Sequence, residues 1–243
     1  MIVPHVRASF GRAEAAFVIW LLSRGVEAER DRLEERLREQ GFDAILDDPR
    51  TLNAVLAGPK FSSASLELTF YLLVRQALLE GGMDDRVLAD YVTSILVAFG
   101  RTGRAFRPED EPRQFYYLSD IVSAADATTG SHTFRLRVHL GEFALWLSGL
   151  FPDHITARTR RRGAPGLDYY EQLGATGFRL AARSPDAESW GLSGMYRDCA
   201  DGFPDLRIAL NRIADRHLFP ATGDRIERLL RQVADEFDRK RMI

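Results

Sequence analysis

The chain has 243 residues, of which 45% are hydrophobic and 28% are charged, and its formal net charge at pH 7 is −2. This composition is ordinary for a soluble globular protein with a substantial core. The near-neutral charge supplies no bulk attraction to nucleic acid or to anionic lipid, so neither is expected as a partner.

Cys199 is the only cysteine, which excludes disulfides within the chain and zinc sites built from thiolates. The first residues lack the pattern of a signal peptide, and the apolar runs are too short or too interrupted to cross a bilayer. We therefore expect a cytoplasmic protein without a membrane partner.

Helical patterns dominate the first hundred residues, and strand alternation is absent. Helices are predicted over Ser9–Arg24, Glu27–Glu39, Ser65–Glu80 and Asp84–Phe99, and a short one between Asp48-Pro49 and Gly58-Pro59. The first helix places five apolar side chains on one stripe, namely Phe10, Ala13, Phe17, Trp20 and Leu21. Asp48 has the form of a helix N-cap, since proline follows it at the first helical position.

The segment Glu27–Glu39 contains ten charged residues in thirteen, with Leu33 and Leu37 in a thin apolar seam. Such a segment is either a solvated helix packed along one edge or a surface for interaction with another chain. Both readings stay open at this point.

Gly100–Arg113 contains two glycines and two prolines and has no helical period. It is therefore predicted to be a loop between an N-terminal half, residues 1–100, and a C-terminal half, residues 114–243, which we expect to pack as one domain. Further helices are predicted over Phe115–Thr129, Ser131–Phe151, Asp168–Arg183, a short stretch from Ser184-Pro185, Pro204–His217 and Thr222–Arg239.

These patterns together predict an all-α fold, a multi-helix bundle of about nine to eleven helices. The segment Ser131–Phe151 leads into a stretch that is apolar on every side, which is typical of an interior helix. We therefore expect a central buried helix near residues 131–151.

The candidate catalytic residues begin with His139 and Glu142, which lie one helical turn apart on this central helix. Side chains three positions apart can reach one point, and buried ionisable groups must be paired or useful. Tyr170 and Glu171 complete the candidate set, because they belong to the first turn of the helix Asp168–Arg183. There Asp168 and Glu171 also have the spacing of a capping box.

No metal site is predicted, because the carboxylate di-iron motif Glu-x-x-His does not occur in the chain. If a metal were bound, His139, Glu142 and Asp120 would be the candidate ligands. No cofactor is expected.

The run ITARTRRRG contains Arg158, Arg160, Arg161 and Arg162 and no acidic residue. Clustered guanidinium groups can hold phosphate in bidentate fashion, so these four residues are the candidate phosphate or ligand site. The alternative, a solvated linker between helices, is favoured by the absence of interleaved aromatic residues. In the next helix, Gly174 and Gly177 allow close approach by a neighbouring helix.

Two specific motifs are absent from the chain, namely the phosphate-binding loop G-x-x-x-x-G-K-[ST] and the nucleophile elbow G-x-S-x-G, so the sequence does not support the functions that depend on them. The run from Leu140 to Ala182, with LGEFALWLSGLFP followed by DYYEQLGATGFRLAA, resembles a pairing found in an uncharacterised bacterial all-helical family. The resemblance implies no activity and no site residues.

The sequence favours a helical binding or regulatory module that acts through protein–protein contacts, because no complete catalytic set is present. A homodimer is one form of this hypothesis, since Leu33, Leu37 and the stripe Ile226, Leu229, Leu230, Val233 and Phe237 offer helical faces for pairing. The alternative is an enzyme or ligand sensor with a polar pocket around His139 and Glu142.

Overall fold

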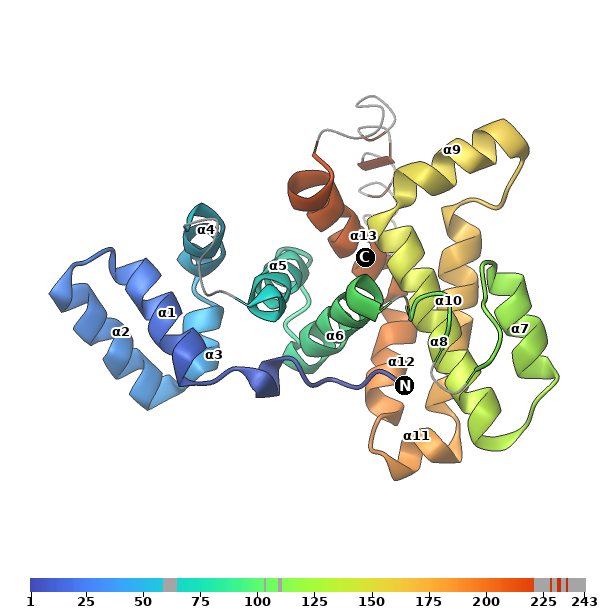
Figure 1. Ribbon diagram of the computed structural model, residues 1–243, viewed down its shortest axis with the longest axis horizontal. Coiled ribbons are helices and arrows are strands. Elements are labelled where there is room, and N and C mark those ends of the chain that lie inside the picture. Colours follow the sequence, from blue (N-terminus) through green and yellow to red (C-terminus); the bar gives the residue numbers. More distant parts are fainter. Residues whose placement is uncertain are drawn as a thin grey trace. The chain divides into compact units, whose positions relative to one another are not determined.

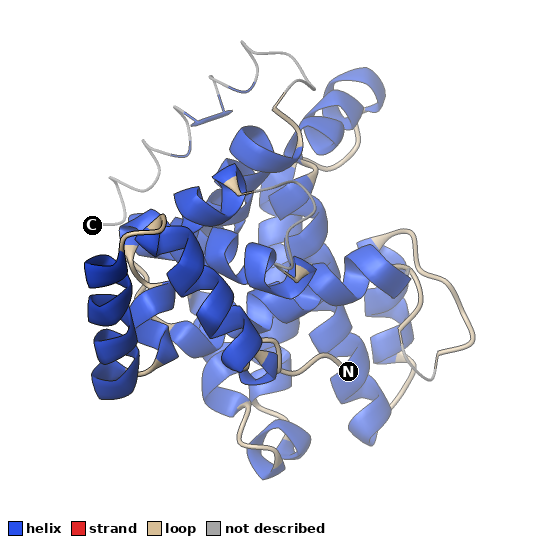
Figure 2. Cartoon of the chain, turned by 60° about the vertical axis from the view of Figure 1, so that its left-hand side comes forward, coloured by secondary structure: helices blue, strands red, loops and turns tan. Residues whose placement is uncertain are grey.

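The computed structural model describes residues 1–58, 65–102, 104–108 and 111–220, together with Arg228, Arg231, Gln232 and Asp235. Within these residues the chain forms thirteen α-helices, eleven of which have seven or more residues, and no strand (Figure 2). The all-α prediction is confirmed. No described helix is long and apolar enough to cross a membrane.

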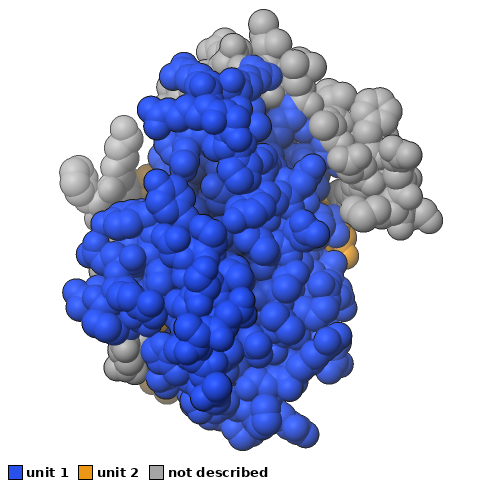
Figure 3. All heavy atoms as spheres, turned by 90° about the vertical axis from the view of Figure 1, so that its right-hand side faces the viewer, with its two compact units in different colours: residues 1, 105–243 blue, residues 2–104 orange. Residues whose placement is uncertain are grey.

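The chain divides into two compact units between residues 104 and 105 (Figure 3). Unit 2 comprises residues 2–104, and unit 1 comprises Met1 and residues 105–243. The boundary lies inside the predicted loop Gly100–Arg113, although the last helix of unit 2 continues to Thr102 and so takes up the first residues of that segment.

Unit 2 consists of a short 3-10 helix and six α-helices (Figure 1): η1 (Arg7–Ser9), α1 (Arg12–Ser23), α2 (Glu27–Gln40), α3 (Phe42–Leu46), α4 (Pro49–Ala57), α5 (Leu66–Glu80) and α6 (Arg86–Thr102). Local signals fix several helix ends. The Asp48 carboxylate accepts a hydrogen bond from the backbone N–H of Arg50 at 3.0 Å, so the predicted cap of α4 is confirmed. Ser65 caps α5 in the same way, through the N–H of Leu68.

The buried face of α1 differs from the stripe that its sequence suggested. Ala15, Val18, Ile19 and Leu22 are buried, whereas Trp20 is 59% exposed. The helix is apolar on two sides, and its contacts with α2 and α4 select the side that includes Val18. Spacing alone could not select the side, because both stripes have helical period.

Arginine pairing stabilises the interior of unit 2. The buried Arg75 donates to Asp47 through Nε at 2.7 Å and through Nη2 at 3.0 Å, and it also pairs with Asp84. Arg86 donates to the same Asp47 at 2.7 Å. Burial of the Asp47 carboxyl opposes ionisation, but the hydrogen bonds from the two arginines outweigh it and hold the pKa of Asp47 below its ordinary value.

In its described residues, unit 1 contains seven α-helices and a π-helical turn: α7 (Leu118–Asp126), α8 (Gly130–Leu150), α9 (Pro152–Arg162), α10 (Leu167–Ala182), α11 (Pro185–Ser189), α12 (Ser193–Asp201), α13 (Phe203–Ile213) and η2 (Ala214–Leu218). The predicted helix Thr222–Arg239 lies outside the described residues, apart from the four single positions named above.

The central helix of unit 1 is α8, as predicted, because fourteen of its residues are buried and α7, α10 and α13 all pack against it. Figure 1 shows α7 and α10 beside it. Two glycines of α10 make the close approach possible. A Cβ at Gly177 would lie 2.8 Å from the backbone oxygen of Arg137, and one at Gly174 would lie 2.3 Å from the Phe203 ring. The predicted use of these glycines in close packing is confirmed.

Candidate anion-binding site

The arginine run of residues 155–163 belongs to a helix, so the interpretation as a solvated linker was wrong. Pro152 occupies the first helical position of α9, and Gly163 ends the helix with a φ of 62° and an N–H bond to the carbonyl of Thr159 at 3.0 Å. Arginine is a strong helix former, and basic residues in the last turn stabilise the negative end of the helix dipole. These local effects explain a helix that shows little apolar periodicity.

One face of α9 forms a wall of a concavity of about 480 Å³, which we call the basic pocket. Its lining residues are Tyr116, Tyr117, His154, Ala157, Arg158, Arg161 and Arg162. The five residues from α9 follow the spacing i, i+3, i+4, i+7 and i+8, which places them on one side of a helix. The volume lies within the range of about 300–1,000 Å³ that is usual for small-molecule sites.

The described lining of the basic pocket is cationic and aromatic. Among the described residues, no carboxylate lines the pocket, and Arg158, Arg161 and Arg162 form no ion pair. The structure therefore brings together three of the four candidate arginines. Arg160 does not line the pocket, because its position falls outside the face that carries the other three. Three neighbouring guanidinium groups can hold an anion such as phosphate through several charge-assisted hydrogen bonds.

Two further lining residues of the basic pocket, Tyr116 and Tyr117, are aromatic and come from the segment that precedes α7. The side chains of Tyr116 and Tyr117 are 58% and 56% exposed. Tyr116 nevertheless has a defined position, because its hydroxyl donates to Gln114 Oε1 at 2.6 Å and its ring lies 5.5 Å from that of Phe106. The sequence analysis missed both tyrosines. The signal available was the run Gln-Phe-Tyr-Tyr directly after the predicted loop.

A buried carboxylate anchors the same segment. Glu111 Oε1 accepts from the backbone N–H of Arg113 at 3.1 Å and from its Nε at 3.0 Å, and Glu111 Oε2 lies 3.2 Å from His132 Nε2 at the start of α8. Burial raises the pKa of Glu111, but the hydrogen bonds from Arg113 and His132 outweigh burial and hold the pKa below its ordinary value. This anchor fixes the segment that carries the two tyrosines.

The candidate pair on the central helix lies in the interior and does not line the basic pocket. His139 is 4% exposed and Glu142 is 2% exposed. The His139 ring stacks on Phe143 with 5.8 Å between centroids. Burial lowers the pKa of His139 to about 3, and a hydrogen bond with the backbone of Ala105 only partly opposes this shift. The imidazole is therefore neutral at physiological pH.

Tyr170 and Glu171, the other two catalytic candidates, have different surroundings. Burial raises the pKa of the Tyr170 phenol, and the charge of Arg158 opposes the shift, so Tyr170 lies near the basic pocket without lining it. Glu171 forms an ion pair with Arg207 of α13. The predicted capping box at Asp168 was wrong, because α10 begins one residue earlier with Gly166 as its N-cap.

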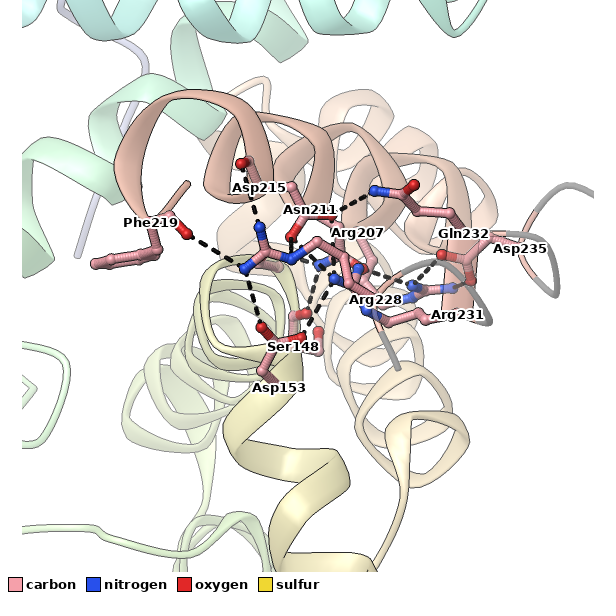
Figure 4. A network of polar contacts seen from close by, with 11 residues as sticks. Ser148, Asp153, Arg207, Asn211, Asp215, Phe219, Arg228, Arg231, Gln232 and Asp235 are labelled. Atoms are coloured by element: carbon pink, nitrogen blue, oxygen red, sulfur yellow. Dashed lines mark hydrogen bonds and ion pairs between the residues drawn. The ribbon is translucent and has the colours of Figure 1, made fainter. Parts of the chain in front are cut away.

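A second group of arginines forms ion pairs and hydrogen bonds with carboxylate and amide side chains, and we call it the paired-arginine network (Figure 4). Its members are Asp153, Glu171, Arg207, Asn211, Asp215, Arg228, Arg231, Gln232 and Asp235. Arg207 Nη2 donates to Asp235 Oδ1 at 2.6 Å, and Arg231 Nη2 donates to Asp215 Oδ1 at 2.9 Å. Asn211 joins the network to α8 through the carbonyls of Ser148 and Gly149, at 2.8 and 2.7 Å.

In the described part of the chain, no three His, Cys, Asp or Glu side chains come together in a way that could hold a metal ion. Asp120, one of the candidate ligands, is exposed on α7. The groups that the structure does gather at a concavity are cationic and aromatic, which suits an anionic organic ligand better than a cation.

Comparison of this chain with protein-family models, with curated proteins and with solved structures finds no match. The resemblance expected from residues 140–182 stays a prediction.

Proposed function

We propose that this chain is a ligand-binding protein whose basic pocket holds a phosphate-bearing small molecule. The observation that carries the proposal is the set of three guanidinium groups, Arg158, Arg161 and Arg162, that share one concavity, with no carboxylate among its described lining residues. Guanidinium groups bind phosphate in bidentate geometry and cannot be deprotonated in a protein, so they suit a permanent anion site.

Binding without catalysis fits the chemistry of the lining. Apart from its arginines, the pocket offers two tyrosines, one histidine and one alanine. Among its described lining residues there is no carboxylate that could orient His154, and nucleophilic catalysis normally needs a base held by a third group. The alternative of an enzyme centred on His139 and Glu142 is less well supported, because a small molecule would have to reach side chains that are 4% and 2% exposed.

The test is calorimetric titration with inorganic pyrophosphate, comparing the natural chain with the triple variant Arg158→Gln, Arg161→Gln, Arg162→Gln. We expect the triple variant to lose at least tenfold in affinity, because a hydrogen bond to a charged group contributes about 1.5–3 kcal/mol. We also expect affinity to fall as salt concentration rises. The free energy of unfolding should change by no more than roughly 0.5 kcal/mol, since these side chains form no ion pair within the described residues.

The matched control removes three positive charges elsewhere, with Arg12→Gln, Arg183→Gln and Arg197→Gln. These three arginines are exposed, and none lines the basic pocket. Pyrophosphate should bind this control as tightly as it binds the natural chain. If pyrophosphate does not bind the natural chain, or if both triple variants bind it equally, the proposed function is wrong.

The remaining hypotheses on partners and location stay predictions. Leu33 is buried within unit 2, so only part of the Leu33 and Leu37 seam is available for pairing, and the stripe from Ile226 to Phe237 lies outside the described residues. A homodimer, a protein partner, a bacterial origin and a cytoplasmic location therefore rest on the sequence patterns alone.

A further inference from the structure

We infer that the ligand of the basic pocket carries an aromatic ring beside its phosphate, which makes it a nucleoside phosphate or a closely similar molecule. The inference rests on the proposed function and adds the chemical class of the organic part. Its basis is the juxtaposition of two exposed tyrosines, Tyr116 and Tyr117, with three arginines that form no ion pair among the described residues, all lining one concavity of about 480 Å³.

The tyrosines form a surface suited to stacking. Tyr116 is held from one direction by the Phe106 ring and by its hydrogen bond to Gln114, yet 58% of the residue remains exposed. A rigid aromatic side chain that stays open to solvent costs little entropy when a second ring stacks on it. A nucleobase gains about 1–3 kcal/mol from such stacking.

The segment that precedes the two tyrosines in the chain is held by several contacts. Phe115 is 2% exposed, and its backbone N–H donates to the carbonyl of Phe106 at 2.7 Å. Glu111 ties the same segment to His132 on α8. Two large apolar rings kept at the surface by a fixed backbone are costly to leave in water, and a ring-bearing ligand would cover them.

The volume and charge of the site also favour a small organic molecule. A concavity of about 480 Å³ is far larger than an inorganic phosphate needs and lies in the range of small-molecule sites. Single-stranded nucleic acid is normally bound along an extended basic track. Here the arginines of the pocket occupy one side of a single eleven-residue helix, in a chain with a net charge of −2.

The experiment compares the affinity of the natural chain for tripolyphosphate with its affinity for ATP, GTP, CTP and UTP. Tripolyphosphate carries the phosphate groups without a ring. We expect at least one nucleoside triphosphate to bind tenfold more tightly than tripolyphosphate. The double variant Tyr116→Ala, Tyr117→Ala should lose this preference, measured as the ratio of the two affinities, whereas Tyr116→Phe, Tyr117→Phe, which retains both rings, should keep it.

The outcomes separate the inference from the proposed function. If tripolyphosphate and all four nucleotides bind equally, or if the alanine variant retains the preference, the aromatic class is wrong while phosphate binding stands. If neither tripolyphosphate nor any nucleotide binds, phosphate binding itself fails. If a single-stranded oligonucleotide binds more tightly than every nucleotide and contacts the same tyrosines, the ligand is a nucleic acid and the inference is overturned. Thermal unfolding of each variant provides the check on folding.

Discussion

Two clusters of unit 1 each contain three arginines and differ in the groups that surround them. The paired-arginine network brings Arg207, Arg228 and Arg231 together with four carboxylates, those of Asp153, Glu171, Asp215 and Asp235. The basic pocket brings three arginines of α9 together with two tyrosines and a histidine, and no carboxylate is among the described residues that line it.

The difference indicates which arginines serve the fold and which are available to a ligand. A guanidinium that is buried and bonded to carboxylates fixes the elements that carry those carboxylates, and removing it leaves buried charges without compensation. An exposed guanidinium without a carboxylate partner contributes little to stability. Its removal should therefore change binding and leave folding intact.

The largest expected effect is on the free energy of unfolding, through a substitution in the paired-arginine network. Arg207→Leu removes the guanidinium that pairs with Glu171 and Asp235 and should lower the free energy of unfolding by about 3–5 kcal/mol, measured by urea denaturation. Arg161→Leu in the basic pocket is the matched control and should change stability by no more than roughly 0.5 kcal/mol. Equal effects of the two substitutions would contradict the division into structural and available arginines.

One histidine buried in the interior of unit 1, His139, and one that lines the basic pocket, His154, allow a pH test of intermediate size. The folded-state pKa of His139 is about 3, below the value of 6.5 for an unperturbed histidine. Between these two pH values the unfolded state therefore binds more protons than the folded state. Stability should therefore fall as pH is lowered from 6.5, by up to about 1.4 kcal/mol per pH unit. The slope should flatten in His139→Gln and persist in His154→Gln. An unchanged slope in His139→Gln would show that another group carries it.

The smallest of the three effects concerns Glu111, which holds the segment that carries Tyr116 and Tyr117. Glu111→Gln should lower stability by about 1 kcal/mol at pH 7, because it weakens the hydrogen bonds with Arg113 and His132. The pKa of Glu111 is depressed in the folded protein, so its contribution is present above pH 4.5 and is lost as pH falls through the folded value. Parallel urea titrations should therefore show that the difference in stability between the natural chain and Glu111→Gln disappears as the pH falls below 4.5.

Local sequence signals determined much of the architecture. Asp48 and Ser65 set the beginnings of their helices through bonds to N–H groups two or three residues away. The apolar character of residues 131–151 predicted α8 as the central helix, and Gly174 and Gly177 marked the close approach to its neighbours. These predictions succeeded because each depends on groups within one or two helical turns, or on whether a side chain tolerates water.

Tertiary structure alone decided which distant positions of the chain became partners. It buried Val18 and left Trp20 exposed on a helix that is apolar on both sides. It brought Tyr116 and Arg158 into the lining of one pocket, and it joined Arg231 to Asp153 across 78 positions of the chain. Charge and aromatic character can be read at each position, but a pairing is a property of two distant positions. Its energy exists only after the helices have packed, because only then do the two groups share a site.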